Sequence, residues 1–262
     1  MQFVDQLNRT VQLKEAPSRI ISLVPSQTEL LIDLGLAHKL VGITKFCLHP
    51  KDTVKSIAKI GGTKNFNLEK IRSLKPDLII ANKEENEEIK LKELMSEFPV
   101  WISNVKNLDQ AIDMIKEIGA ITEETEKANI LSLSISEKFL QFESVKKIKK
   151  RVLYLIWKSP FMSVNKDTFI HDMIKKCGWQ NVCSHSVNRY PSLNEEEIVK
   201  LRPDIVLLSS EPFPFKEKHI ADIKKVFPKS TITMVNGEAF SWYGSKLLTS
   251  TDYFSKLLTE QQ

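Results

Sequence analysis

The sequence predicts an α/β protein of two lobes, each with a parallel-rich sheet flanked by helices, and one long α-helix joining them. Three observations carry this prediction. Short apolar runs alternate with amphipathic segments, a long helical pattern interrupts that alternation once, and one sequence pattern occurs in both halves of the chain. Alternating strands and helices favour a parallel sheet. With 262 residues, the chain is long enough for two compact lobes.

The first lobe is expected to span residues 1–121. A loose alternation over 5–13 predicts a short hairpin, and Ser26-Gln-Thr-Glu29 predicts a capping box at the start of a helix. The remaining predicted strands are 19–24, 39–44, 77–81 and 100–103, and the remaining predicted helices are 68–74, 84–98 and 108–118.

The segment 122–147 differs because it contains neither Gly nor Pro. Its apolar residues recur at steps of three or four, which predicts one amphipathic helix. They are Ala128, Leu131, Ile135, Phe139 and Phe142. At about 1.5 Å per residue, such a helix would span roughly 40 Å, enough to join two lobes.

The second lobe is expected to span 148–262, where the alternation resumes. Gly178 predicts the C-terminal end of a helix, since glycine readily adopts the left-handed conformation. The predicted strands are 152–156, 204–208 and 231–235, and the predicted helices are 169–177, 194–201 and 244–258.

One sequence pattern occurs twice. Residues 68–80 and 195–207 share an order of acidic, apolar, Leu, basic and Pro-Asp residues, followed by a strand. Glu69 and Glu196 each lie seven residues before the proline of their copy. The repetition indicates two similar halves around a rigid connector.

Composition narrows the function. The 38 basic and 33 acidic residues are mixed along the chain, so a net charge of +5 gives little support for nucleic-acid binding. No run of 18 apolar residues predicts a membrane span. The spacing of Cys47, Cys177 and Cys183 fits no standard zinc template, and whether Cys177 and Cys183 pair stays open.

The first ten residues lack the charged and apolar regions of a signal peptide. Two locations therefore stay open. The protein is expected in the periplasm or cell envelope if a signal peptide was removed, and in the cytoplasm if Met1 is the true start.

Several motifs follow one another along the chain: Arg19-Ile-Ile-Ser-Leu-Val-Pro-Ser-Gln-Thr-Glu29, Val41-Gly-Ile43, Gly61-Gly62 and the Asn67-Leu-Glu-Lys-Ile segment with its Lys-Pro-Asp. Together they resemble a known family, the helical-backbone (class III) periplasmic binding proteins with a nitrogenase-like fold, and most closely the cobalamin-binding and iron-complex branch. The resemblance covers nearly the whole chain in order.

The resemblance implies the substrate-binding component of an ABC importer rather than an enzyme. Its ligand is expected to be a metal-containing small molecule held in the cleft between the lobes, first a corrinoid such as cobalamin, otherwise haem or a ferric siderophore. No covalent cofactor is expected, and the protein is expected to be a monomer. Glu69 and Glu196 match the acidic residues with which relatives dock on arginines of the importer's membrane subunits.

Ligand contacts are expected in loops that follow strands, because α/β sheets bind ligands at the carboxyl ends of their strands. Aromatic and sulfur side chains in these loops suit an apolar ligand surface. Lys246 stands where relatives carry an arginine. The expected set is Ser26, Gln27, Phe46, Cys47, His49, Asn65, Phe66, Phe161, Met162, Trp242, Tyr243 and Lys246, with His49 also a candidate metal ligand.

Two alternatives stay open. A receptor for free zinc, manganese or iron needs three or four converging His, Asp or Glu ligands, and only His49 of the five histidines falls in such a loop. An intracellular corrinoid or haem carrier would account for the missing signal peptide. An enzyme is disfavoured, because the common nucleophile, phosphate-loop and zinc-protease motifs are absent.

Overall fold

The computed structural model describes residues 1–261, and the chain divides into two compact units. The first contains 1–105, 109–136 and 243–246, and the second contains 106–108, 137–242 and 247 onward. Helix α6, Thr125–Glu143, runs from the first unit into the second. Each unit is an α/β layer structure with a parallel sheet, which confirms the predicted fold class.

The first unit is built on a five-stranded parallel sheet in the order β5-β4-β3-β6-β7. Its strands are β3 Ile20–Ser22, β4 Leu40–Ile43, β5 Ala58–Lys59, β6 Leu78–Asn82 and β7 Val100–Ser103. Its helices are α1 Pro25–Asp33, η1 Ala37–Lys39, α2 Lys51–Lys55, α3 Leu68–Leu74, α4 Glu88–Met95 and α5 Leu108–Ile121.

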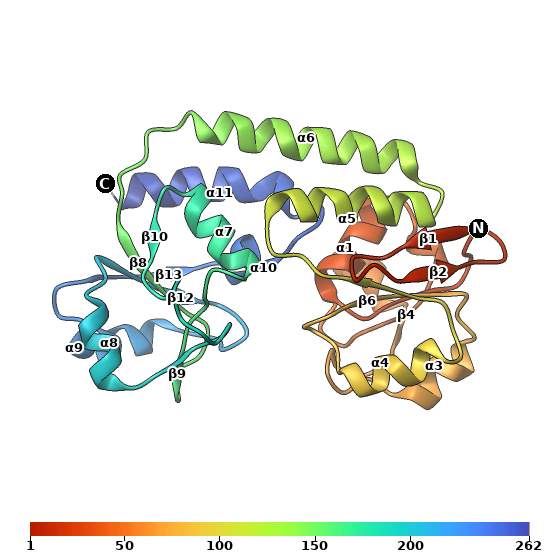
Figure 1. The fold of residues 1–262 in the computed structure, drawn as a ribbon, viewed down its shortest axis with the longest axis horizontal. Coiled ribbons are helices and arrows are strands. Elements are labelled where there is room, and N and C mark those ends of the chain that lie inside the picture. The colour runs from red at the N-terminus through yellow and green to blue at the C-terminus, as the bar shows by residue number, and fades with distance from the viewer. Residues whose placement is uncertain (262) are drawn as a thin grey trace. The chain divides into compact units, whose positions relative to one another are not determined.

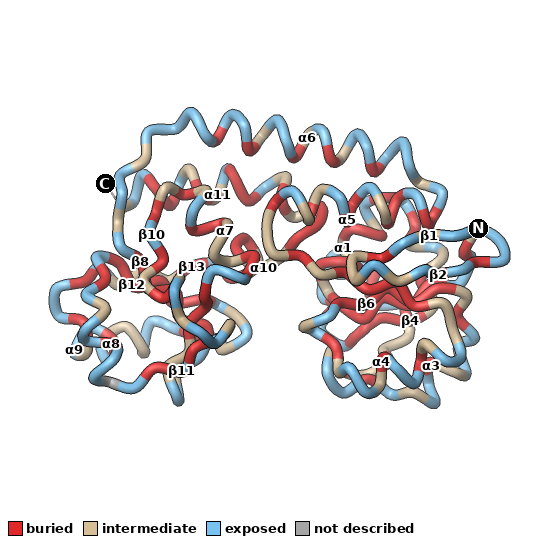
Figure 2. Tube along the Cα trace, viewed as in Figure 1, coloured by how far each residue is buried: buried red, intermediate tan, exposed pale blue. Residues whose placement is uncertain are grey.

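The strands of this sheet are apolar because both faces are covered. Helices α3 and α4 pack on one face, and α1 and α5 lie on the other (Figure 1). Ile71 and Leu94 bury their side chains against Ile79 and Ile102 of the sheet. Strand β6 is buried along its whole length (Figure 2). Such strands read as continuous apolar runs, as the sequence predicted.

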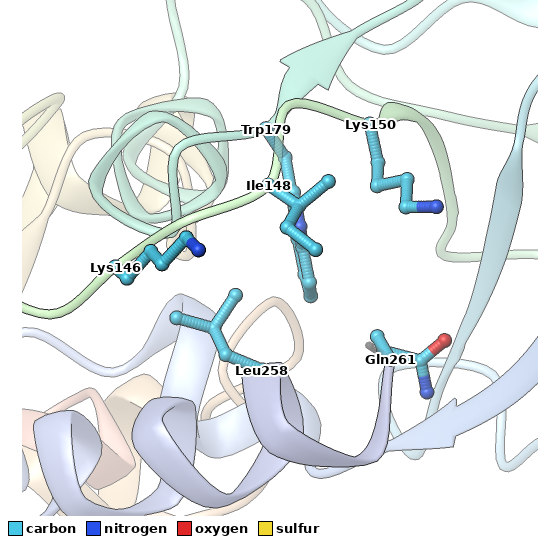
Figure 3. A pocket seen from close by; sticks show the side chains of 6 residues that line it. All are labelled: Lys146, Ile148, Lys150, Trp179, Leu258 and Gln261. Carbon is cyan, nitrogen blue, oxygen red and sulfur yellow. The ribbon is translucent and has the colours of Figure 1, made fainter.

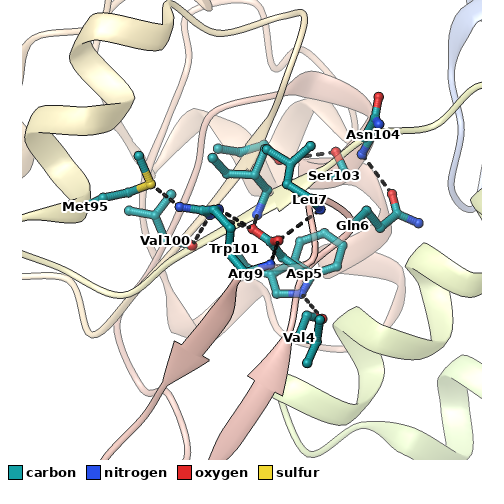
Figure 4. A network of polar contacts seen from close by, with 12 residues as sticks. Val4, Asp5, Gln6, Leu7, Arg9, Met95, Val100, Trp101, Ser103 and Asn104 are labelled. Atoms are coloured by element: carbon teal, nitrogen blue, oxygen red, sulfur yellow. Dashed lines mark hydrogen bonds and ion pairs between the residues drawn. The ribbon is translucent and has the colours of Figure 1, made fainter.

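A hairpin of β1 Gln2–Val4 and β2 Thr10–Gln12 is tied to the sheet by a buried carboxylate (Figure 4). Asp5, which is 2% exposed, accepts hydrogen bonds from the backbone N–H groups of Leu7, Arg9 and Ile102. The Arg9 guanidinium donates to Asp5 and to the carbonyl of Val100. A hairpin is therefore present and is held against β7, but its first strand, Gln2–Val4, precedes the predicted segment 5–13, and residues 5–9 form the connection.

The second unit has a four-stranded parallel sheet in the order β10-β8-β12-β13, with a separate antiparallel pair, β9 and β11. Its strands are β8 Arg151–Leu155, β9 Phe161–Met162, β10 Gln180–Asn181, β11 Ser192–Leu193, β12 Ile205–Ser209 and β13 Thr231–Val235. Its helices are α7 Phe169–Lys176, α8 Glu195–Leu201, η2 Glu217–His219, α9 Ile220–Val226, α10 Gly237–Ser241 and α11 Leu247–Glu260.

The two copies of the repeated pattern fold alike. Asn67 caps α3 by accepting a hydrogen bond from the N–H of Lys70, and Asn194 caps α8 by accepting one from the N–H of Glu197. Both helices end in the left-handed conformation, at Lys75 (φ 46°) and Arg202 (φ 43°). The two copies therefore share their helix caps as well as the order of residue types predicted from the sequence.

Four local predictions are wrong, one of them the helix expected at 84–98, which spans only Glu88–Met95. Helix α1 begins at Pro25, with no side-chain cap at Val24, so the predicted capping box is not formed. Proline suits the first position of a helix. The helix expected at 122–147 is shorter, since Glu123 is left-handed (φ 64°) and α6 stops before the like-charged lysines of 146–150. The helix expected at 244–258 begins at Leu247, because Gly244 has φ 129°.

Within the described residues, none of the helices combines the length and the apolar character that a membrane crossing requires.

Candidate ligand-binding site

In the first unit, the predicted residues gather where β3 and β4 end. Helix α1 follows β3 with Ser26 and Gln27 in its first turn, and the loop after β4 carries Phe46, Cys47 and His49. Parallel strands bring these loops to one edge of the sheet, where α/β proteins bind ligands. The structure therefore brings five of the predicted residues to the same edge of this unit.

Gln27 lies beneath that edge rather than on it. Its side chain is fully buried, and its Nε2 donates to Ser103 Oγ at 2.6 Å. Asn82 Nδ2 donates to the same hydroxyl at 2.9 Å. Gln27 Oε1 is buried without a hydrogen-bond partner among residues 1–261. Gln27 thus joins the ends of β6 and β7 to α1 and supports the edge from below.

The loop after β4 splits its side chains between core and surface. Cys47 is 2% exposed, and its Sγ lies 3.1 Å from Thr28 Oγ1 and 3.2 Å from Thr44 Oγ1. Phe46 is 51% exposed, with the Lys45 amine 5.1 Å from its ring centroid. His49 is exposed as well. The buried thiol anchors the loop, and Phe46 and His49 are exposed on it.

Asn65 and Phe66 are adjacent in sequence but differ in exposure. Asn65 is exposed, whereas Phe66 is 2% exposed and packs in the hydrophobic core with Ile60 and Ile71. A Cβ on Gly61 would lie 2.5 Å from the carbonyl oxygen of Asn65, so this turn needs glycine. The turn directs Phe66 inward, and this ring is not at the surface.

A short C-terminal segment belongs to the first unit. A Cβ on Gly244 would lie 3.3 Å from the carbonyl oxygen of Ser26, so 243–246 packs on the start of α1. Tyr243 is 6% exposed and Lys246 is half-buried. The structure therefore places Ser26, itself 5% exposed, next to residues more than 200 positions later in the chain.

In the second unit, the loops after β8, β12 and β13 lie at one edge. Phe161 and Met162 form β9, which pairs with β11, and both are half-buried. Trp242 follows α10, and its indole Nε1 donates to Glu211 Oε1 at 2.9 Å. Ser241 Oγ donates to the same oxygen at 2.7 Å. Glu211, directly after β12, thus holds Trp242 in place.

Sequence reasoning missed two parts of this edge, Glu211 and the aromatic pair of exposed Trp157 and half-buried Phe213. Trp157 is 39% exposed, and its ring meets Phe213 edge-on at 5.4 Å between centroids. The signal was present in Glu211-Pro-Phe-Pro-Phe215, since prolines and aromatics follow the predicted strand 204–208 directly.

The two acidic residues expected to dock on an importer lie one in each unit, at the starts of α3 and α8. Glu69 has a side chain that is 84% exposed and forms an ion pair with Arg72. Arg72 also pairs with Glu93 and Glu97, and these three carboxylates raise the pKa of Arg72. Glu196 is exposed and forms no ion pair within residues 1–261.

Metal ligands do not converge in the described part of the chain. No three His, Cys, Asp or Glu side chains among residues 1–261 lie close enough to hold a metal ion. His49 is exposed, and the neighbouring thiol of Cys47 points into the core.

A small pocket lies at the other edge of the second unit's sheet (Figure 3). Lys150 and Trp179 directly precede β8 and β10, so the pocket is at the amino ends of the strands, away from the predicted ligand residues. Its lining residues are Lys146, Ile148, Lys150, Trp179, Leu258 and Gln261.

Sequence comparison finds matches over most of the chain. A family described as periplasmic binding protein matches residues 20–229. The vitamin B12-binding protein of Pectobacterium atrosepticum is 24% identical over 255 residues, which cover 93% of this chain and 89% of that protein. An uncharacterised ABC transporter substrate-binding lipoprotein of Bacillus subtilis, YvrC, is 29% identical over 213 residues, 78% of this chain and 67% of that protein.

Solved structures show the same fold. The periplasmic vitamin B12-binding protein BtuF of Vibrio cholerae superposes with a TM-score of 0.78 at 23% identity, over 94% of this chain and 99% of that chain. A possible iron-binding periplasmic solute-binding protein of Staphylococcus epidermidis gives a TM-score of 0.77 at 27% identity, over 94% and 99% of the two chains.

Proposed function

We propose, from the premise that this chain belongs to the family of periplasmic binding proteins, that it captures a corrinoid for an ABC importer. Relatives of known substrate class support the corrinoid, since several proteins named vitamin B12-binding protein match over most of the chain. The family consists of solute-binding proteins, and we propose that this member likewise binds its cargo without chemical change.

The observation that carries the proposal is the set of aromatic side chains at the carboxyl edges of the two sheets. Exposed Phe46 lies at this edge of the first unit, and exposed Trp157 and half-buried Phe161 lie at this edge of the second. A corrinoid presents a broad, largely apolar ring system with polar amides at its rim. Exposed aromatic side chains suit the ring faces, because each buries a large apolar area at low entropic cost.

Polar side chains at the same edges suit the amides of the rim. His49 and Asn65 are exposed in the first unit, and Lys246 is half-buried there. An amide rim needs single donors and acceptors rather than a charged fork, so lysine is an adequate donor. Cys47, Gln27 and Phe66 are buried, and we assign them to support of the loops rather than to ligand contact.

Delivery requires docking on the importer, for which we propose Glu69 and Glu196. Each is an exposed carboxylate in the first turn of a helix, one per unit, and each is suited to bidentate pairing with arginine. Glu69 is already paired with Arg72, so an importer arginine would have to compete for it. We place the protein in the cell envelope, where its substrate-binding relatives act.

Ligand titration tests the proposal. Adding cyanocobalamin to the purified protein should shift the visible spectrum and raise the melting temperature, because a ligand that binds only the folded state stabilises it. Haemin, a ferric siderophore and Zn²⁺ are titrated in parallel. If one of these compounds binds and cobalamin does not, that compound replaces the corrinoid as the assigned ligand. If none of the four binds, the protein does not capture a ligand of the proposed class.

Charge reversal tests the docking assignment separately. The double variant Glu69→Lys, Glu196→Lys should bind cobalamin as the wild type does but support less uptake through the reconstituted importer. The matched control is Glu88→Lys with Glu217→Lys, which makes the same charge change at other exposed acids. Equal uptake by the double variant and the wild type would discard these two residues as docking contacts.

A further inference from the structure

The segment between α6 and β8 carries the densest positive charge in the sequence. Residues 145–151 read Val-Lys-Lys-Ile-Lys-Lys-Arg, and they run beside the end of α7, which adds Lys175 and Lys176. The contact is close, since a Cβ on Gly178 would lie 2.7 Å from Lys147 Cβ, and Gln180 N donates to the Lys150 carbonyl at 2.8 Å. We call these nine residues the basic surface.

Few negative charges offset the seven cations of the basic surface. Lys176 pairs with Glu143 at 2.8 Å, and Asp204 accepts the backbone N–H of Arg151. Lys146, Lys149 and Lys150 form no ion pair within residues 1–261. The carbonyl ends of α6, α7 and α11 contribute about half a negative charge each. Those helix ends explain why lysines are tolerated here, but a positive excess remains.

Two apolar side chains are exposed among these cations. Val145 is 37% exposed and Ile148 is 43% exposed. Ile148 lies between Lys146 and Lys150 at the small pocket, whose other lining residues include Trp179 and Leu258 (Figure 3). Alternating cations and exposed aliphatic side chains are typical of segments that lie on a membrane surface, where the chains enter the headgroup region.

We propose that the basic surface binds the anionic headgroups of a phospholipid bilayer. The lysine amines contact headgroup phosphates, and Val145 and Ile148 insert between the headgroups. A nucleic acid or another soluble polyanion would pair with the cations but would gain nothing from the two aliphatic side chains.

The position of the basic surface defines how the second unit would be oriented on a bilayer. The basic surface lies at the amino ends of the strands, whereas Trp157, Phe161 and Trp242 follow their carboxyl ends. A protein attached through the basic surface therefore holds these loops of the second unit away from the bilayer, open to solute. This inference does not depend on which ligand the loops bind.

Vesicle sedimentation with the full chain tests the proposal. The protein should bind vesicles of equal parts phosphatidylglycerol and phosphatidylcholine and should not bind phosphatidylcholine alone. Each lysine near an anionic surface contributes about fivefold in affinity, so Lys146, Lys149 and Lys150→Gln together should weaken binding by about 100-fold. Ile148→Ser should weaken binding several-fold at unchanged charge.

The matched control is the triple variant Lys218, Lys225 and Lys229→Gln, which makes the same change in net charge elsewhere on the second unit.

Three outcomes would overturn the proposal. Equal loss in both triple variants would mean that net charge alone acts. If Ile148→Ser binds the vesicles as tightly as the wild type, insertion into a bilayer is excluded. Displacement of the vesicles by inorganic phosphate at matched ionic strength would leave a simple anion site. Thermal melting of each variant checks that it is folded.

Discussion

Asp77 accepts hydrogen bonds from the backbone N–H of Arg19 through both of its carboxylate oxygens, at 2.9 and 3.0 Å. The Arg19 side chain in turn donates to the carbonyls of Leu74 and Lys75, at the end of the helix before Asp77. Arg151 and Asp204 make the corresponding contacts in the second unit. One clasp of helix end, strand start and Pro-Asp turn is thus used in both units.

These matching contacts predict that replacing the aspartate destabilises the two units equally. Asp77→Ala and Asp204→Ala should each lower the free energy of unfolding by about 1–2 kcal/mol, because each leaves the backbone N–H of an arginine, Arg19 or Arg151, without its carboxylate acceptor. Chemical denaturation measures the change. Glu137→Ala, an exposed position of α6, should change it little. A large loss in only one unit would mean that the repeated contacts are not equivalent in energy.

Glu211 and Trp242 predict that ligand affinity depends on a residue remote in sequence from the predicted site. Glu211→Ala removes the acceptor of the indole N–H and frees Trp242, so it should weaken ligand binding about tenfold, the cost of one charged hydrogen bond. Glu211→Gln keeps an acceptor oxygen and should retain most of the affinity. Titration followed by tryptophan fluorescence distinguishes them. Equal affinity in the wild type and both variants would mean that Trp242 needs no support.

Phe46 and Phe66 predict opposite effects of the same substitution. Phe66→Ala removes a fully packed ring from the core and should cost about 3–5 kcal/mol of stability. Phe46→Ala removes a ring that is 51% exposed, so it should change stability little and weaken ligand binding. Thermal melting and ligand titration on both variants provide the comparison. If Phe46→Ala binds the ligand as tightly as the wild type, Phe46 is not a ligand contact.

Glu117 predicts a pH-dependent stability. Burial, then the charges of Asp113 and Asp5, raise the pKa of Glu117 to about 7. A raised pKa means that the folded state favours the protonated carboxyl. Its stabilisation is complete below the usual pKa of 4.5 and is lost as the pH rises through 7. Glu117→Gln should therefore melt at a higher temperature than the wild type above pH 7, with the gain shrinking towards the usual pKa.

The control for this comparison is Glu126→Gln, an exposed acid in the first turn of α6. Its melting temperature relative to the wild type should not change over the same pH range. A constant difference between Glu117→Gln and the wild type at all pH values would show that Glu117 does not titrate near neutrality.

The sequence by itself determined the order of strands and helices, the repeat and the family. These follow from local patterns: the strand Leu78–Asn82 is apolar up to its last residue, and Pro76 and Pro203 each mark the end of a helix. Short-range periodicity and turn chemistry are sufficient for such features. Once the strands were predicted, the loops that follow them could also be predicted as the ligand-binding loops.

Only the tertiary structure decided which side chains in those loops face outward. Phe46 and Phe66 both occupy loops, and both are apolar, but the turn at Gly61 buries one of them. Glu211 meets Trp242 across 31 positions, because β12 and β13 are adjacent parallel strands. Burial and long-range hydrogen bonds depend on how distant elements pack, and no local pattern in the sequence encodes that packing.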